Sequence, residues 1–541
     1  MITDNLDELL NTVAKNVDLG HKKRDLSFLR QVQTLCLNPG GTAAGGSVSP
    51  SAMMSAYRFA GNPGIDLDKL RKVRMETTLS HVDAGETVLL INDVSLLDYC
   101  RHLSKEDRRD IGDGKGKGYE YVCNLAVSLK REQTLGVLHD CLISSNGPDD
   151  MSAVDYFDAP LLKSLPEKSI AKLPCNHKHM ITTHALHVSK KFPDVKFISV
   201  ADREFDDYFH FLALKKNGMD AVIRSCANRN VQIIKPAWLP TEALTGRQSG
   251  LPLLPGHVCV SMNQLVKHVP LSHLKTVWLD KKERLTGEGP EAEAVPVSAG
   301  TFRITLYRNA MRDNTYVKAS EYVELNIVVV KETRPRKGRE PILWVLLSTL
   351  PVDSMDQISE IVRIYELRWL IECFFKLLKS GFGLEDLRFD GVEKIGRHLI
   401  VTTIAAAFVC ALKSSLGLGA ATELDDESYR KVKHASKNLN DGSIDIGLRL
   451  FAFIAMQGKW CGYRRNGISP AMLMKGLAKT LSFLEMMESI SDFLSEASKH
   501  LRSFFLFSRL ILSYSSRRLL NSLELFFFIK FFIRSKPGFV S

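Results

Sequence analysis

Polar side chains recur at helical spacing within residues 364–380, IYELRWLIECFFKLLKS, and most of the intervening positions are apolar. At about 100° per residue the polar members fall within an arc of about 80°, which predicts one amphipathic helix. Those members are Tyr365, Arg368, Glu372, Lys376 and Lys379. A carboxylate can hold a hard divalent cation, and arginine and lysine can hold phosphate groups. This face therefore suits chemistry on a nucleic-acid backbone.

Two aspartates stand at the ends of apolar runs. Asp93 ends the run within residues 87–99, and Asp202 ends the run within residues 195–209. Runs rich in Val, Ile and Leu predict buried strands. An acid just past the carboxyl end of such a strand lies at the usual ligand-binding edge of an α/β sheet. Each aspartate taken alone is also a common cap for the next helix or turn.

Together these segments resemble the DDE transposases of the insertion-sequence-four type, in the transposon-five-like branch. The spacing Y-x2-R-x3-E-x6-K over residues 365–379 is similar to the YREK signature of that family. Asp93, followed by Ser95 and Tyr99, resembles the setting of the first catalytic aspartate. The tripeptide at residues 202–204 is similar to the D-R-E setting of the second. The resemblance covers roughly residues 1–485.

The resemblance implies an α/β fold with a ribonuclease-H-like catalytic core. It implies a helical DNA-end-binding domain over residues 1–80, a core over 81–485 with a β-rich insertion at about 236–350, and a helical C-terminal region. Residues 486–541 depart from the ending typical of the family, because they are rich in phenylalanine and basic residues. This tail is interpreted either as a frameshifted or read-through end or as an amphipathic partner or membrane-surface helix.

The resemblance also assigns roles to residues. It makes Asp93, Asp202 and Glu372 the catalytic acids and the ligands of two Mg²⁺ ions, with Mn²⁺ as a substitute. Trp344 matches an aromatic residue that stacks on a flipped base, although a tryptophan in a predicted strand is as readily a core residue. The residues expected to contact DNA are Tyr365, Arg368, Lys376, Lys379, Arg203, Arg224, Trp344, Lys22, Lys23, Arg24 and Arg58.

The activity implied is cut-and-paste transposition. The enzyme would bind the terminal inverted repeats, nick the DNA, form and open a hairpin, and join the 3′ ends to target DNA. Its partners would be double-stranded DNA and a second copy of the chain in a synaptic homodimer, in the bacterial cytoplasm at the nucleoid and without a membrane. Two alternatives are a relic that only binds DNA or inhibits active subunits, and a structure-selective nuclease on the same core.

Bulk properties agree with a nucleic-acid partner. The 541 residues carry a net charge of +11 with a pI near 9.0, as expected for a protein that binds an anionic polymer. The ten cysteines form no C-x-x-C pair, which is typical of a reducing cytosol. The histidine-rich segment at residues 175–187 has no second ligand set elsewhere, so zinc is disfavoured. The apolar segment at 398–416 predicts a buried core helix rather than a membrane span.

Overall fold

The computed structural model describes most of the chain up to residue 415. The described residues are 2–37, 50–149, 177–225, 228–245, 253–280, 292–306, 322–334 and 340–415, with residues 434 and 476. The chain divides into two compact units, Met1–Thr422 and Glu423–Ser541. The predicted C-terminal region at 486–541 and Cys175 of the histidine-rich segment lie outside the described residues.

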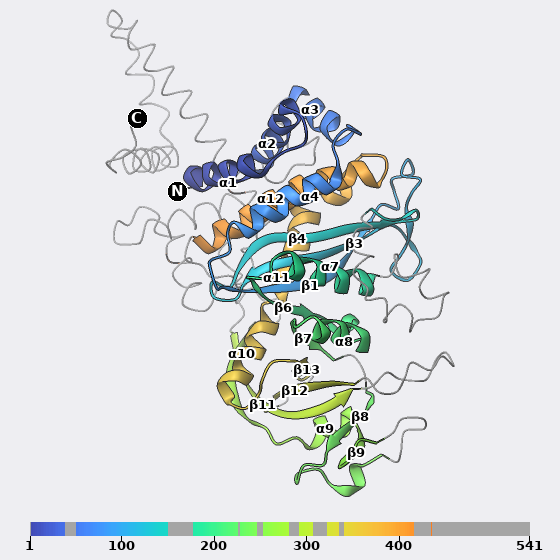
Figure 1. The fold of residues 1–541 in the computed structure, drawn as a ribbon, viewed down its shortest axis with the longest axis vertical. Coiled ribbons are helices and arrows are strands. Elements are labelled where there is room, and N and C mark those ends of the chain that lie inside the picture. Colours follow the sequence, from blue (N-terminus) through green and yellow to red (C-terminus); the bar gives the residue numbers. More distant parts are fainter. Residues whose placement is uncertain are drawn as a thin grey trace, which may run out of the picture. The chain divides into compact units, whose positions relative to one another are not determined.

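The described part of the first unit begins with four helices and then combines strands with further helices (Figure 1). The helices are α1 (Ile2–Asn16), α2 (Lys22–Leu37), α3 (Pro50–Ala60), α4 (Leu67–Leu79), α7 (His177–Lys191), α8 (Tyr208–Lys216), α9 (Met262–His268), α10 (Met355–Glu366), α11 (Trp369–Lys376) and α12 (Val392–Ser415). Short helical turns are η3 (Arg203–Phe205), η4 (Thr241–Ala243), η5 (Leu377–Gly381) and η6 (Leu384–Asp386). The strands are β1 (Thr87–Asp98), β2 (Arg109–Ile111), β3 (Gly116–Ser128), β4 (Gln133–Ser144), β5 (Gly147–Pro148), β6 (Lys196–Ala201), β7 (Asp220–Arg224), β8 (Asn230–Ile234), β9 (His257–Ser261), β10 (Ser272–Asp280), β11 (Ala292–Leu306), β12 (Val323–Glu332) and β13 (Leu343–Ser348).

The centre of the sheet has the order β4-β3-β1-β6-β7. Strands β3 and β4 are antiparallel to their neighbours, whereas β1, β6 and β7 run parallel. The apolar run at the start of β1 is fully buried, as expected for a central strand covered on both faces. A mixed sheet with this order and helices packed on it confirms the predicted mixed α/β class and is consistent with a ribonuclease-H-like domain.

The strands predicted for the insertion are present and extend the same sheet. Strand β13 pairs antiparallel with β7, and β12, β11, β8 and β9 follow outward in that order. Strand β11 begins at Ala292 and pairs with β10 as well as β12. Since hydrogen bonds cross from β7 to β13, the β-rich segment is tied directly to the strand next to β6.

Helices cover both faces of the central strands, as consecutive residues of β4 show. Asp140 receives two hydrogen bonds from Arg74 of α4, at 2.5 and 2.7 Å, and both side chains are buried. His139 packs its ring against His184 of α7, with ring centroids 3.8 Å apart. Because neighbouring residues of a strand point to opposite faces, α4 and α7 lie on opposite sides of the sheet. The buried Arg74–Asp140 pair therefore fixes the N-terminal helices to the core.

Helix α12 lies on the α4 side and contacts α2, α4 and β4. Its segment Val392–Ala411 is long and apolar enough to cross a membrane, but 83% of its most apolar window is buried inside the protein. That burial against three elements confirms the prediction of a core helix. In Figure 1, α2 and α3 lie beyond α12 and α4 as seen from the strands.

Candidate active site

The parallel pairing of β1 and β6 brings the two predicted aspartates together. Its last matched pair is Asn92 with Ala201; Asp93 is the next residue of β1, and Asp202 directly follows β6. The expectation that Asp93 lies past the end of its strand is wrong, because β1 continues to Asp98 in antiparallel pairing with β3. The two aspartates thus lie at the end of the parallel pairing, which falls in the middle of β1.

The single helix predicted over residues 364–380 is interrupted. Helix α10 ends at Glu366, α11 runs from Trp369 to Lys376, and a π-helical turn follows. At the interruption the backbone N–H groups bond three residues back, as from Arg368 to Tyr365 at 3.1 Å. Such bonds tighten the helix, whereas the π-turn widens it, so uniform spacing of 100° per residue does not hold across this segment.

Arg368 and Glu372 still meet, since they are one turn apart on either side of the start of α11. The Arg368 guanidinium donates through Nη2 to Glu372 Oε1 and through Nη1 to Asp93 Oδ2, the latter at 3.4 Å. The Arg368 side chain is 12% exposed, so this bridge is largely shielded from water. One cation therefore joins two of the three predicted acids.

Asp93 has an unusual protonation equilibrium. Its pKa is raised to about 6, mainly by burial, and the negative charges of Asp202 and Glu372 contribute in the same direction. A hydrogen bond from the Val94 N–H, at 2.8 Å, and the charge of Arg368 act in the opposite direction. Two further carboxylates thus lie close enough to Asp93 to oppose its ionisation, and a perturbed pKa of this kind is typical of functional sites.

Tyr365 is buried beside Arg368 and is not on a solvent-exposed polar face. Its side chain is buried, its ring packs edge-on against Trp344 with centroids 5.3 Å apart, and the Arg368 guanidinium lies 5.8 Å from the ring centroid. Burial raises the pKa of Tyr365, so the phenol is protonated at neutral pH. Arg224 of β7 lies near the same phenol and donates a hydrogen bond to the Leu343 carbonyl. The structure therefore joins Tyr365, Trp344 and Arg224 to the acid site.

The predicted lysines occupy two different settings. Lys379, in the π-turn, donates to the Leu96 carbonyl of β1 and forms an ion pair with Glu385 at 3.3 Å. Lys376 is exposed on α11, and Arg203 is exposed directly after Asp202. The Arg203 backbone N–H donates to Asp202 Oδ1 at 2.6 Å, whereas no ion pair joins these three side chains to Asp93, Asp202 or Glu372 among the described residues.

The predicted N-terminal cations are not part of this cluster. Lys22 and Lys23 are exposed at the start of α2, and Arg58 is exposed on α3. Arg24 is half-buried and donates to the Leu19 carbonyl at 3.4 Å. Both helices pack on α12, on the side of that helix away from β1 in Figure 1. Any DNA that these residues contact must therefore follow a different surface from the acid site.

Two residues near the acids were not predicted as part of this site, although His177 belongs to the histidine-rich segment for which zinc was disfavoured. His177 of α7 bonds to Glu120 of β3 at 3.3 Å and to Glu204, two residues after Asp202, at 2.7 Å. Burial opposes its charge, but these two hydrogen bonds outweigh burial and raise the pKa of His177 to about 9. Trp369 is 51% exposed beside Arg368. On an ideal helix Trp369 lies about 40° from Tyr365, so the helical spacing could have placed it beside the predicted polar face. The contacts of His177 could not be predicted in this way, because they depend on tertiary structure.

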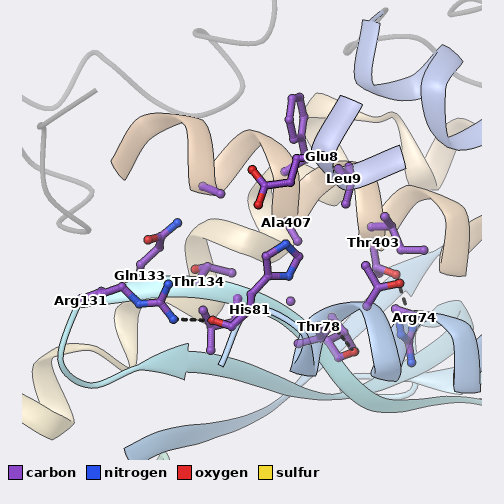
Figure 2. A pocket seen from close by; sticks show the side chains of 17 residues that line it. Glu8, Leu9, Arg74, Thr78, His81, Arg131, Gln133, Thr134, Thr403 and Ala407 are labelled. Atoms are coloured by element: carbon purple, nitrogen blue, oxygen red, sulfur yellow. Dashed lines mark hydrogen bonds between the residues drawn. The ribbon is translucent and has the colours of Figure 1, made fainter. Parts of the chain in front are cut away.

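A cavity of about 200 Å³ lies elsewhere, between α1, α4, β4 and α12 (Figure 2). Glu8, His81 and Thr403 point into it, and Arg131 donates to the His81 carbonyl at its margin. None of the three predicted acids lines this cavity. It is a separate feature on the α4 side of the sheet.

The donor chemistry of the acid site fits divalent ions. Asp93, Asp202 and Glu372 offer hard carboxylate oxygens from three elements, and their charges interact. In the part of the chain that the structure describes, no three His, Cys, Asp or Glu side chains are already gathered as a metal-binding group. Two of the acids are instead bridged by the Arg368 guanidinium.

Residues 182–408 match the family described as Transposase DDE domain. The match includes Asp202, Arg368 and Glu372, and Asp93 lies before it. It supports a DDE transposase, whose substrate is DNA and whose class generally uses divalent metal ions. The match and the geometry thus point to the same region of the chain.

Proposed function

We propose that this protein is a cut-and-paste DNA transposase of the insertion-sequence-four type. One observation carries the proposal: Asp93 and Asp202 are adjacent at the end of the β1–β6 pairing, and Arg368 connects Asp93 to Glu372 of α11. Three acids on three elements, two of them inside a match to a transposase domain, are the arrangement that strand cleavage requires.

Asp93, Asp202 and Glu372 would hold two Mg²⁺ ions, with Mn²⁺ as a substitute. Such ions, when bound, activate the attacking oxygen and stabilise the leaving oxygen of an in-line displacement at phosphorus. By the resemblance, Asp93 would help to hold both ions.

The surrounding residues would bind and align the DNA. Arg368 and Lys379 would contact phosphates, with Lys376 and Arg203 extending the positive surface around the acids. Trp344 would support a base beside the scissile phosphate, and Tyr365 would hold Arg368 and Trp344 in place. Small errors in such alignment cost large factors in rate. Lys22, Lys23, Arg24 and Arg58 would contact the inverted repeat farther from the cut.

The experiment is a cleavage assay with purified protein, Mg²⁺ and a labelled duplex that carries the inverted repeats flanking its gene. Cuts at the element boundary that disappear in Glu372→Gln, while end binding persists, are the expected result. Equal cutting of a scrambled duplex would indicate a structure-selective nuclease. Binding without cleavage by the unaltered protein would indicate a DNA-binding relic.

A further inference from the structure

Among the described residues, one side chain forms ion pairs with two acids of the candidate site. Arg368 is the side chain whose ion pairs reach both Asp93 and Glu372 in the described part of the chain. Lys379, the next cation along the segment, is held by Leu96 and Glu385 instead. The bridge is therefore specific to one guanidinium and does not reflect a general excess of positive charge.

Arg368 also lies beside the Tyr365 ring and is largely buried. The Tyr365 ring lies 5.8 Å from the guanidinium carbon, and only 12% of the Arg368 side chain is exposed. The contact with Asp93, at 3.4 Å, is long for a charge-assisted hydrogen bond. Arg368 thus fills the space between the acids, but one of its two bonds is weak.

We propose that Arg368 is an internal counter-cation that occupies the divalent-metal site until DNA phosphate draws it away. This inference rests on the proposed function, because it takes the three acids to be metal ligands. A phosphate group offers the guanidinium a bidentate partner, and a divalent ion offers the carboxylates a stronger one. Metal binding and DNA binding therefore favour each other, and an isolated subunit binds divalent ions weakly.

The test is a Mn²⁺ titration of the DNA-free full chain, followed by the electron paramagnetic resonance signal of free Mn²⁺. Arg368→Gln is expected to bind Mn²⁺ on the order of tenfold more tightly than the unaltered protein, which is within the usual range for coupled sites. Lys376→Gln is the matched control, because it removes the same charge from α11 without breaking the bridge. It is expected to change the affinity by no more than about twofold.

Arg368→Lys provides a second variant in case Arg368→Gln does not fold. A lysine keeps the charge but lacks the planar guanidinium that reaches two carboxylates. The Mn²⁺ affinity of Arg368→Lys is therefore expected to lie between those of the unaltered protein and Arg368→Gln. Glu372→Gln identifies the site, since binding there must weaken when a ligand is removed.

The outcomes separate this inference from the proposed function. Equal affinities in the unaltered protein and in both Arg368 variants, with loss of binding in Glu372→Gln, would overturn the counter-cation role and leave the metal site standing. The same would follow if Lys376→Gln tightened binding as much as Arg368→Gln. Mn²⁺ binding that does not depend on Glu372 in any variant would instead overturn the metal site on which the proposed function depends.

Discussion

Replacing Asp93 with asparagine is expected to stabilise the metal-free protein at neutral and alkaline pH. The pKa of Asp93 is raised from 3.8 to about 6, and its side chain is only 19% exposed. Each pKa unit corresponds to about 1.4 kcal/mol, so the ionised carboxylate lowers the free energy of unfolding by about 2–3 kcal/mol. Asparagine keeps an oxygen for the Val94 N–H and removes the charge.

The sign of the pH dependence follows from the direction of the shift. A folded pKa above the unfolded value means that the native state binds more protons between pH 3.8 and about 6. The unaltered protein therefore loses stability as the pH rises through this window, and Asp93→Asn does not. The difference between the two is expected to be near zero at pH 4 and to reach its full size above pH 7.

The assay is urea denaturation in the presence of a chelator at pH values from 4 to 8. Asp98→Asn is the matched control, because Asp98 is exposed on the same strand and its pKa is lowered rather than raised. That control is expected to show no stabilisation at high pH. Adding Mg²⁺ should stabilise the unaltered protein more than Asp93→Asn. A difference that is independent of pH, or a variant that is less stable at pH 8, would refute the reasoning.

Three further predictions concern contacts around the site. Arg74→Met is expected to lower the free energy of unfolding by about 3–5 kcal/mol, because the buried Asp140 carboxylate loses its ion pair with Arg74. Urea titration measures this change, and a loss below 1 kcal/mol would contradict the prediction. His177→Gln is expected to destabilise the protein most below pH 6.5 and to have no effect above pH 9. The pKa of His177 is raised in the folded state, so its stabilising positive charge is lost as the pH rises. Thermal melts across that pH range measure the difference, and a difference that does not change with pH would count against the prediction. Lys379→Gln is expected to weaken end binding and to reduce its salt dependence by roughly one unit of slope; anisotropy titrations at several salt concentrations measure this, and an unchanged slope would exclude a phosphate contact.

The strand-level features of the site could be predicted from sequence. Apolar runs that end in Asp93 and Asp202 are strong local signals, and parallel pairing of their strands places the two acids together. Burial of α12 was also predicted, because a histidine and a lysine flank its apolar segment; the helix is long enough to cross a membrane, but 83% of its most apolar window is buried. These features depend on local pattern, which a single sequence carries.

The finer features depend on tertiary contacts. An ideal helix over 364–380 predicted Tyr365 on a polar face, whereas the change of hydrogen-bond pattern near Arg368 turns that ring against Trp344. Antiparallel pairing with β3 carries β1 past Asp93, and no local signal marks that extension. The bridge from Arg368 to Asp93 joins residues 275 positions apart, so it follows only from the packed fold.

The most direct measurement is anomalous diffraction from crystals of the protein with Mn²⁺ and a duplex transposon end. The account predicts Mn²⁺ peaks within coordination distance of Asp93, Asp202 and Glu372, with the Arg368 guanidinium moved onto a phosphate. Absence of Mn²⁺ between these carboxylates, with Arg368 still bridging Asp93 and Glu372 beside bound DNA, would contradict it.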